Sequence, residues 1–412
     1  MSALAALVAS VALAAHPTTY VSSEAQFAAA VAARSFSGGT IVLAPGSYGE
    51  LVVPARSSAL LRVVGSRRVH VERLLLEGTQ HVSIGPLMIT PRTEDASVEV
   101  DASAHVDLHD LLVTAQGTTH MAGVVVPDSR DVVIRRSVFT HCGDRSIAWA
   151  NCLLLWRFSH DVTVEDDWFH DCLGCDFIHG RFGSGLVVRR NRFDRALPCH
   201  IGRRRCGHQD LIELFAGRGL RVEANRFGVY ERGGAQLYLT GHTDDVAIVN
   251  NVFLGTDPRV PGYHGHIGIV VGSRGPRNLG LPRNVRIVNN TILTGARRSD
   301  GYLGSLRMSS RYRVLPRRER PLLANNVIGV LSWPWPVCRV VRASVSNVMA
   351  KGVTCSDSDT SGPVDLDARG RPTAGSTLVI DAASRRYAPK TDITGRRRGA
   401  RPDVGAYEYP GR

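Results

Sequence analysis

Lysine is almost absent from this sequence of 412 residues, in which Lys351 and Lys390 are the only two. Lysine and arginine together number 50 and the formal net charge is +13, so arginine carries nearly all of the positive charge. Such an excess favours an acidic partner, which could be a uronate or sulfate polysaccharide, a nucleic acid or an anionic surface. Arginines spread over solvated faces are the alternative explanation.

The chain also lacks the marks of membrane-spanning and nucleic-acid-binding proteins. No run approaches the ~20 apolar residues that a membrane span requires, and basic motifs with interleaved aromatic residues are absent. We therefore expect no membrane span and no nucleic-acid partner. Aromatic residues make up only 6% of the chain, whereas 43% is hydrophobic and glycines number 41. This composition indicates a thin, extended core with many turns.

A shorter apolar run, residues 3–15, lies near the start of the chain. Its length is typical of the h-region of a secretory signal peptide, and Ala12-Leu13-Ala14 is a small-x-small cleavage sequence, although no basic residue precedes the run. We expect residues 1–15 to be a signal peptide and the mature protein to be secreted and extracellular. A short core helix is the alternative.

A short phrase recurs along the middle of the chain: two aliphatic residues separated by one position, then polar residues, then an aromatic or aliphatic residue. Its alternation with period two predicts strands, and its copies start 24 to 39 residues apart. A unit of this length can bury its apolar face only against a stacked neighbour, so we predict one elongated all-β solenoid. The copies start at Val82, Val106, Val132, Val162, Leu186, Leu220, Val246, Val285 and Pro321.

Asparagines stand at the end of many of these strands. Asparagine tolerates the left-handed backbone conformation and bonds to its own turn, so we predict a stacked, turn-forming role for them. A binding face lined by the same residues is the alternative. The residues are Asn191, Asn225, Asn250, Asn251, Asn289, Asn290, Asn325 and Asn326.

The region before the repeat contains a second group of structural patterns. Residues 22–34 read as a capped amphipathic helix with Phe27 and Val31 on one face, and a Gly-x-Thr-Ile-x-Leu strand and a Pro-Gly-x-Tyr turn follow over residues 38–48. In these residues the chain resembles the secreted right-handed parallel β-helix proteins of the pectate-lyase-like superfold. The resemblance implies a right-handed parallel β-helix with an N-terminal capping helix over residues 16–355, then a C-terminal loop and closing segment over residues 356–412. The superfold hosts lyases, hydrolases, esterases, epimerases and non-catalytic adhesins, so it does not specify a reaction.

Eight cysteines in a chain expected to be secreted predict disulfides. Their positions within the repeat place two pairs on successive coils, and two other pairs would close loops. A metal site at Cys172 and Cys175 is the alternative, which the absence of a second close-spaced pair disfavours. The predicted disulfides are Cys142–Cys172, Cys152–Cys175, Cys199–Cys206 and Cys338–Cys355.

A column of polar residues accompanies the repeat. Asp176, Asp210 and Gln236 each lie ten residues before a repeat start, so we expect them to stack on consecutive coils, roughly 4.8 Å apart. Two stacked carboxylates repel each other unless one is protonated or a cation lies between them. A Ca²⁺ ion held by Asp176 and Asp210 is such a cation and the only cofactor predicted. Carboxylates that cap turns by accepting backbone N–H bonds are the structural alternative.

The same flank supplies the candidate site. A β-elimination needs a cation to neutralise a uronate carboxylate and a base to remove a proton. With no lysine nearby, that base would be a histidine or Arg181. A glycoside hydrolase would instead need two carboxyl groups, Asp176 with Asp210 or Glu213. The catalytic candidates are Asp176, His179, His208, Asp210 and Glu213, and the substrate-binding candidates are Arg181, Tyr238 and His266.

These observations together predict a secreted, monomeric β-helix protein that acts on an acidic polysaccharide by lyase-type β-elimination. A glycoside hydrolase and a non-catalytic carbohydrate-binding or surface protein are the alternatives. An enzyme requires the polar column to converge in one groove, whereas a binding protein requires only exposed arginine and aromatic side chains.

Overall fold

The computed structural model describes most of the chain between residues 17 and 411. The predicted signal peptide at residues 1–15 lies outside the described residues, and so do Cys199, Cys206, His208 and His266. The described ranges are 17–55, 59–91, 96–114, 122–142, 151–173, 175–196, 200–201, 204–205, 210–228, 234–255, 267–272, 280–294, 305–331 and 337–411.

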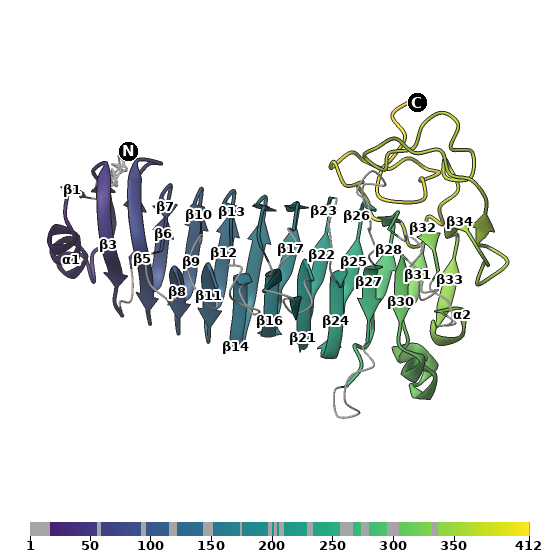
Figure 1. Cartoon of the computed structure of the whole chain (residues 1–412), viewed down its shortest axis with the longest axis horizontal. Helices are drawn as coiled ribbons and strands as arrows, with labels where there is room; N and C mark the ends of the chain where they lie inside the picture. The colour runs from purple at the N-terminus through teal and green to yellow at the C-terminus, as the bar shows by residue number, and fades with distance from the viewer. Residues whose placement is uncertain are drawn as a thin grey trace, which may run out of the picture.

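Within these ranges, 33 strands form one continuous sheet that is wound into a stack of coils (Figure 1). Each strand pairs in parallel with the equivalent strand of the next coil, which produces three ladders along the molecule. Three long strands, β3 (Gly46–Val53), β5 (Val69–Glu77) and β14 (Asn151–Glu165), bend at a corner and take part in two ladders each. A separate antiparallel pair joins β19 (His200–Ile201) to β20 (Arg204–Arg205).

The first ladder contains the aliphatic part of each repeat. Its strands are β1 (Thr18–Val21), β2 (Gly39–Leu43), β4 (Leu61–Val64), β6 (Gln80–Ile84), β9 (Ala104–His109), β12 (Arg130–Arg135), the second half of β14 (Asn151–Glu165), β17 (Val187–Arg189), β22 (Arg221–Glu223), β25 (Ala247–Val249), β28 (Arg286–Val288), β31 (Leu322–Ala324) and β33 (Ala343–Val345).

The second ladder contains the aromatic or aliphatic end of each repeat. Its strands are β3 (Gly46–Val53), β5 (Val69–Glu77), β7 (Met88–Ile89), β10 (Leu112–Thr114), β13 (Val138–Thr140), β15 (Trp168–His170), β18 (Arg192–Asp194), β23 (Arg226–Phe227), β26 (Val252–Phe253), β29 (Thr291–Ile292), β32 (Val327–Val330), β34 (Val348–Lys351) and β35 (Thr360–Ser361).

The third ladder carries the predicted polar column. It begins with the second halves of β3 and β5 and includes the first half of β14. Its other strands are β8 (Val98–Asp101), β11 (Val124–Pro127), β16 (Asp176–Ser184), β21 (Ile212–Arg218), β24 (Ala235–Asp244), β27 (Ile267–Val271) and β30 (Leu306–Met308).

The interior of the stack confirms the predicted repeat. Val106, Val132 and Val162 are partners in register and are buried. Buried phenylalanines stack along the second ladder with ring centroids 4.4 to 5.1 Å apart, as equivalent positions of a parallel ladder require. These rings belong to Phe139, Phe169, Phe193, Phe227 and Phe253. The expected all-β parallel β-helix is therefore confirmed.

The expected N-terminal helix is present as α1 (Glu24–Ala33) and lies at the N-terminal end of the stack (Figure 1). The Ser23 side chain caps it by accepting a hydrogen bond from the backbone N–H of Gln26. Its buried face consists of Phe27, Ala30 and Val31. The other described helices are η1 (Ser310–Val314), η2 (Arg317–Glu319) and α2 (Val337–Val340). Of the helices described, none is long and apolar enough to cross a membrane.

An asparagine ladder lines the corner between the first and second ladders. Each Oδ1 accepts a hydrogen bond from the backbone N–H at the same position of the preceding coil: Asn290 accepts from Asn251 at 2.9 Å. The Asn290 Nδ2 in turn donates to the carbonyl of Ile248 at 2.8 Å. The predicted stacked turn role is confirmed. The ladder residues are Asn191, Asn225, Asn251, Asn290, Asn326 and Asn347, all buried.

Three coils carry a second asparagine directly before the ladder residue: Asn250, Asn289 and Asn325. Its φ is 52–57°, the left-handed conformation that asparagine tolerates. The side chains of these three residues are not part of the asparagine ladder. They bond instead to the C-terminal segment. The Nδ2 groups donate to carbonyl oxygens of Thr391, Asp403 and Ser384 respectively, at 2.8 to 3.0 Å.

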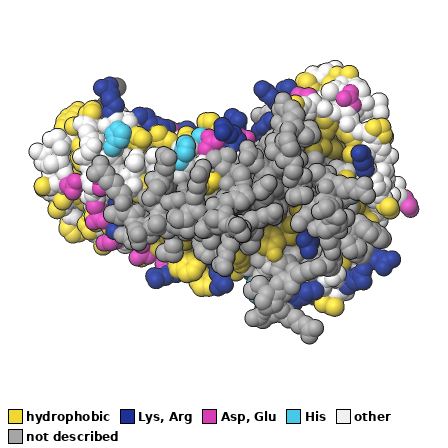
Figure 2. All heavy atoms as spheres, in the orientation of Figure 1, with side chains coloured by type: hydrophobic (Ala, Val, Ile, Leu, Met, Phe, Trp, Pro, Cys, Tyr) yellow, Lys and Arg dark blue, Asp and Glu magenta, His cyan; other side chains and the backbone are white. Residues whose placement is uncertain are grey.

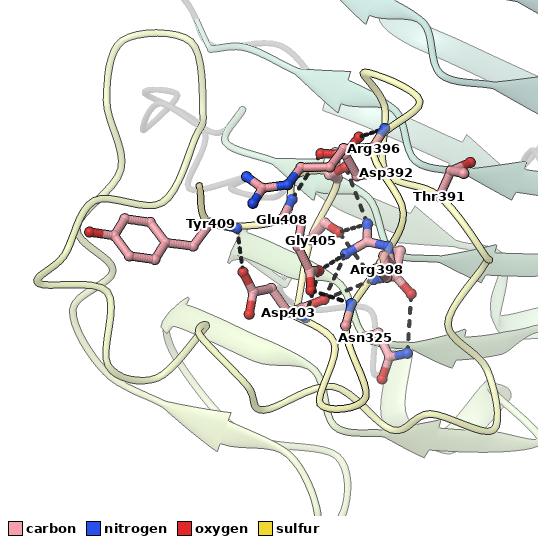
Figure 3. A network of polar contacts seen from close by, with 12 residues as sticks. Asn325, Thr391, Asp392, Arg396, Arg398, Asp403, Gly405, Glu408 and Tyr409 are labelled. Carbon is pink, nitrogen blue, oxygen red and sulfur yellow. Dashed lines mark hydrogen bonds and ion pairs between the residues drawn. The ribbon is translucent and has the colours of Figure 1, made fainter. Parts of the chain in front are cut away.

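The C-terminal segment, residues 362–411, returns along the outside of the solenoid next to the coils of β26 to β34 (Figure 1). Arg398 is the centre of its contacts (Figure 3). This buried guanidinium donates to Asn250 Oδ1 at 3.0 Å and to the Gly405 carbonyl at 2.8 Å, and it pairs with Glu408 at 3.1 Å. Together with the asparagine contacts, these bonds attach the segment to three successive coils through buried and partly buried hydrogen bonds.

The cysteine predictions are only partly correct. Cys338 and Cys355 form the expected disulfide, with an S–S distance of 2.08 Å. Cys142, Cys152, Cys172 and Cys175 are buried but free, so the predicted pairs Cys142–Cys172 and Cys152–Cys175 are wrong. The sulfurs of Cys152 and Cys172, one from each predicted pair, lie 3.1 Å apart, which exceeds a disulfide bond of about 2.05 Å. The predicted pair Cys199–Cys206 lies outside the described residues.

Many arginines pair with carboxylates of a neighbouring coil. Arg135 forms two hydrogen bonds of 2.7 Å with Asp107, and Arg190 binds both Glu165 and Asp166. Figure 2 shows the Lys and Arg side chains of the face in view distributed along the molecule, not gathered in one patch. Part of the arginine content therefore fastens coil to coil, and the net charge alone does not identify a partner.

Candidate functional site

The predicted polar column occupies the third ladder, where β16, β21 and β24 lie side by side. His179 is the register partner of Glu213, and Glu213 is the partner of Tyr238. Leu154 and Val270, the equivalent residues of the flanking coils, are apolar. The polar residues of this column are thus confined to three adjacent coils.

A histidine held between two carboxylates forms the centre of this site. The Nδ1 of His179 lies 2.7 Å from Asp176 Oδ2 and 3.4 Å from Glu213 Oε2. The side chain of His179 is 20% exposed, whereas those of Asp176 and Glu213 are 8% and 6% exposed. The imidazole is therefore the member of the cluster that reaches the solvent, and the carboxylates lie behind it.

The surroundings of Asp176 and His179 raise the pKa of both side chains. Burial raises the pKa of Asp176 to about 7, since the hydrogen bond from His179 only partly offsets the loss of solvation and the nearby charge of Asp210 adds to the rise. Burial also acts to lower the pKa of His179, but the bonds to Asp176 and Glu213 outweigh it and raise the pKa to about 9. At neutral pH the cluster holds an imidazolium.

Asp176 and Asp210 stack on consecutive coils as predicted, and they act as backbone caps. The backbone N–H of Asp210 donates to Asp176 Oδ1 at 2.7 Å. The backbone N–H of Ala235 donates to Asp210 Oδ1 in the same manner. This is the structural role considered above, and Asp176 combines it with the contact to His179 through its second oxygen.

Gln236 does not continue this ladder, contrary to the prediction. Leu237 is the register partner of Ile212, which places Ala235 opposite Asp210. Gln236 lies one residue further along, is fully buried, and donates to the carbonyls of Gly228 and Leu254 at 3.0 Å.

These contacts limit how Ca²⁺ could bind. One oxygen of Asp176 and one of Asp210 already accept backbone hydrogen bonds, and the second oxygen of Asp176 faces His179. Ca²⁺ takes six to eight oxygen ligands, so these two residues alone do not fit a calcium site. Asp176 does have two neighbours whose ligand atoms lie within 4.8 Å of its own and of each other, His179 and Glu213, but together they form a mixed nitrogen and oxygen set. The Ca²⁺ requirement stays a prediction that needs further ligands.

Two further residues complete the face around His179. The ring of Phe215 packs edge-on against His179, with centroids 4.8 Å apart. The exposed Arg181 places its guanidinium carbon 5.9 Å from the centroid of the same ring. Arg181 was predicted, whereas Phe215 was missed. Period two from Glu213 would have placed Phe215 on the same face.

The coil before β16 adds exposed aromatic residues that the sequence analysis also missed. In β14 the pairing with β16 is irregular between Leu155 and Ser159, and Trp156 and Phe158 lie within this irregularity. Trp156 is 48% and Phe158 61% exposed. The register partners of Leu155 and Ser159 are Gly180 and Phe182 of β16, the two residues on either side of Arg181. Both aromatic residues therefore lie on the coil next to Arg181. Exposed aromatic faces of this kind suit stacking against a sugar ring.

Two predicted residues, His208 and His266, lie outside the described residues. Of the rest, the structure brings Asp176, His179 and Glu213 into direct contact, places Arg181 and Tyr238 on the same strands or the next one, and gives Asp210 a capping role.

The register of three parallel ladders defines the protein as a parallel β-helix. No protein-family model matches the chain, and its sequence matches no curated protein.

Several solved structures resemble it. An alginate lyase from Paenibacillus sp. str. FPU-7 is 14% identical over 62% of this chain and 90% of that chain, with a TM-score of 0.41. The pectate lyase Pel9A is 12% identical over 95% of this chain and 96% of that chain, with a TM-score of 0.45. A GH87 alpha-1,3-glucanase from Streptomyces thermodiastaticus strain HF3-3 is 13% identical over 82% and 52%, with a TM-score of 0.43.

Proposed function

We propose that this protein is a secreted enzyme that cleaves an acidic polysaccharide by β-elimination at the face of β16, β21 and β24. The observation that carries the proposal is the arrangement of His179, which reaches the solvent while two buried carboxylates hold its Nδ1. A residue held in this way is oriented for proton transfer through its other nitrogen, Nε2.

The elimination assigns separate roles to the described residues. Arg181 pairs with the uronate carboxylate and offsets the negative charge that builds up when the neighbouring C5 proton is removed. His179 Nε2 accepts that proton, a double bond forms between C4 and C5, and the C4–O bond breaks. The leaving oxygen takes up a proton from water, and His179 later returns its own proton to the solvent. Asp176 and Glu213 position the imidazole, and Tyr238, Trp156 and Phe158 contact the sugar.

The pKa of about 9 decides when His179 can act as a base. The neutral imidazole accepts a proton and the imidazolium does not, so the rate should rise with pH and level off above about 9. An alkaline working range follows directly from the two carboxylates that hold the ring.

Glycoside hydrolysis is a second candidate. Asp176 and Glu213 present oxygens within 4.8 Å of each other, which approaches the spacing of about 5 Å in retaining glycosidases. The pKa of about 7 for Asp176 would suit a general acid. Both carboxylates are however more than nine-tenths buried behind His179, although a glycosidase needs them in contact with the glycosidic bond. The burial favours elimination.

The disulfide Cys338–Cys355 supports the secreted location, because such bonds persist in oxidising compartments. A non-catalytic binding protein would use the same exposed Arg181, Trp156 and Phe158 and would need no proton transfer.

The test is ultraviolet absorbance of the unsaturated uronate product, measured with a panel of acidic polysaccharides with and without Ca²⁺. The His179→Ala variant should lose about 10²- to 10⁴-fold in rate, as expected for a missing acid–base group. His170→Ala is the matched control, because His170 also lies 2.7 Å from a carboxylate, that of Asp171, but on the second ladder.

The outcomes are distinct. New reducing ends without absorbance would favour hydrolysis, and binding without either product would leave a carbohydrate-binding protein. An equal loss in both histidine variants would contradict a catalytic role for His179.

A further inference from the structure

Four cysteines from two successive coils converge inside the solenoid. Cys142 follows β13 and Cys152 lies in β14, whereas on the next coil Cys172 follows β15 and Cys175 precedes β16. All four are at most 1% exposed. Both coils thus place two sulfurs at the same interior corner, directly before Asp176.

The sulfur separations are too long for disulfides. Cys152 Sγ lies 3.1 Å from Cys172 Sγ and 4.0 Å from Cys175 Sγ, and the sulfurs of Cys142, Cys152 and Cys172 all lie within 4.8 Å of one another. A disulfide requires about 2.05 Å. Around a tetrahedral ion with metal–sulfur bonds of about 2.3 Å, sulfurs lie about 3.8 Å apart. The two sulfur pairs bracket that value.

The same molecule contains a bonded pair for comparison. Cys338 and Cys355 are joined at 2.08 Å. The four interior sulfurs do not separate into two such pairs: Cys152 has both cysteines of the next coil as near neighbours. One sulfur shared between two partners is the arrangement of a common centre, not of a cross-link.

We propose that Cys142, Cys152, Cys172 and Cys175 bind one thiophilic divalent metal ion, Zn²⁺ by preference, in a tetrahedral all-sulfur site. Thiolate sulfur selects soft and borderline ions over Ca²⁺ or Mg²⁺. Cys175, whose sulfur lies 4.0 Å from that of Cys152, is the fourth ligand beside the group of three, so no position is left open and the site is structural. It fastens two coils together immediately before the strand that carries Asp176 and His179. This inference does not depend on the proposed enzymatic function.

The test uses the full chain, purified in the absence of chelators, and measures bound metal by mass spectrometry. We expect one zinc ion per chain. Replacement by Co²⁺ should produce the visible absorption of a tetrahedral thiolate–cobalt complex. The Cys152→Ser variant should lose the metal, whereas the double variant Cys338→Ser/Cys355→Ser should retain it, because those cysteines form the separate disulfide.

Peptide mapping of the wild-type protein without reductant supplies the opposing result. Peptides joined by disulfides among Cys142, Cys152, Cys172 and Cys175, in protein that contains no metal, would overturn the proposal. Because this measurement and the cobalt spectrum both use the wild-type chain, the outcome is readable even if Cys152→Ser does not fold.

Discussion

The asparagine ladder and the Asp176–Asp210 column use the same contact to the backbone of a neighbouring coil, but they differ in the polar atoms that remain for other partners. At both, an oxygen of one coil accepts a hydrogen bond from the backbone N–H of its neighbour: Asn290 Oδ1 does so for Asn251, and Asp176 Oδ1 for Asp210. An asparagine amide also has N–H donors, which Asn290 uses on the carbonyl of Ile248. A carboxylate has only acceptors, so its second oxygen needs a donor from outside the ladder.

His179 is that donor for Asp176. The difference shows how a structural ladder becomes chemically useful. The amides of the asparagine ladder bond within the stack of coils, whereas the carboxylate of Asp176 also holds an acid–base group in place.

The largest effect should come from breaking the amide ladder. Asn290→Leu removes the acceptor of the Asn251 N–H and a donor to Ile248, and leaves these buried groups unpaired. We expect the free energy of unfolding to fall by about 3–5 kcal/mol, measured by denaturant titration. Arg286→Ala on the exposed face of the same coil is the control, expected within about 0.5 kcal/mol. Equal effects would refute the idea that the ladder holds the coils.

Removing the charge behind His179 should change the pH dependence. In Asp176→Asn the hydrogen-bonded anion that raises the pKa of His179 is lost, whereas Asn Oδ1 can still accept the Asp210 N–H. The midpoint of the pH–rate profile should therefore move down from about 9 by about one pH unit or more. Asp171→Asn, which uncharges the partner of His170, should leave the profile unchanged. An unmoved midpoint in Asp176→Asn would show that another group is the base.

The smallest effect is expected at Asp210. Asn in place of Asp210 retains an oxygen that can accept the Ala235 N–H, so stability should change by less than about 1 kcal/mol. Activity should stay within a few-fold of the wild type, since His179 is held by Asp176 and Glu213. A large loss that excess Ca²⁺ restores would instead identify Asp210 as a calcium ligand. Thermal unfolding and rate measurements at several Ca²⁺ concentrations distinguish the two results.

Counting from repeat starts predicted much of this molecule, and its failures have local causes. The count placed Asp176 opposite Asp210 correctly because two register shifts between β16 and β21 cancel. Between β21 and β24 a single shift remains: Leu214 pairs with Leu239 but Ala216 with His242, so β24 holds one extra residue. The count therefore placed Gln236 opposite Asp210 instead of Ala235. Gly241, with a φ of 63°, lies where β24 holds the extra residue.

Other features depend on side-chain geometry that spacing does not contain. Cys142 and Cys172 were recognised as equivalent positions, but equivalence says nothing of whether their sulfurs bond. Trp156 and Phe158 owe their exposure to an irregular stretch of β14. His179 contacts Asp176, three residues earlier in the same strand, and Glu213 on the neighbouring coil. A count along one strand could only suggest that both contacts are made at once.

The paired asparagines also constrain how this protein could change in length during evolution. A solenoid can gain or lose a coil by duplication or deletion, because each coil meets the next through equivalent contacts. Asn250, Asn289 and Asn325 are bound to fixed points of one C-terminal segment. A coil inserted among these three would separate the asparagines from their partners, so relatives of different length should differ on the N-terminal side of β25.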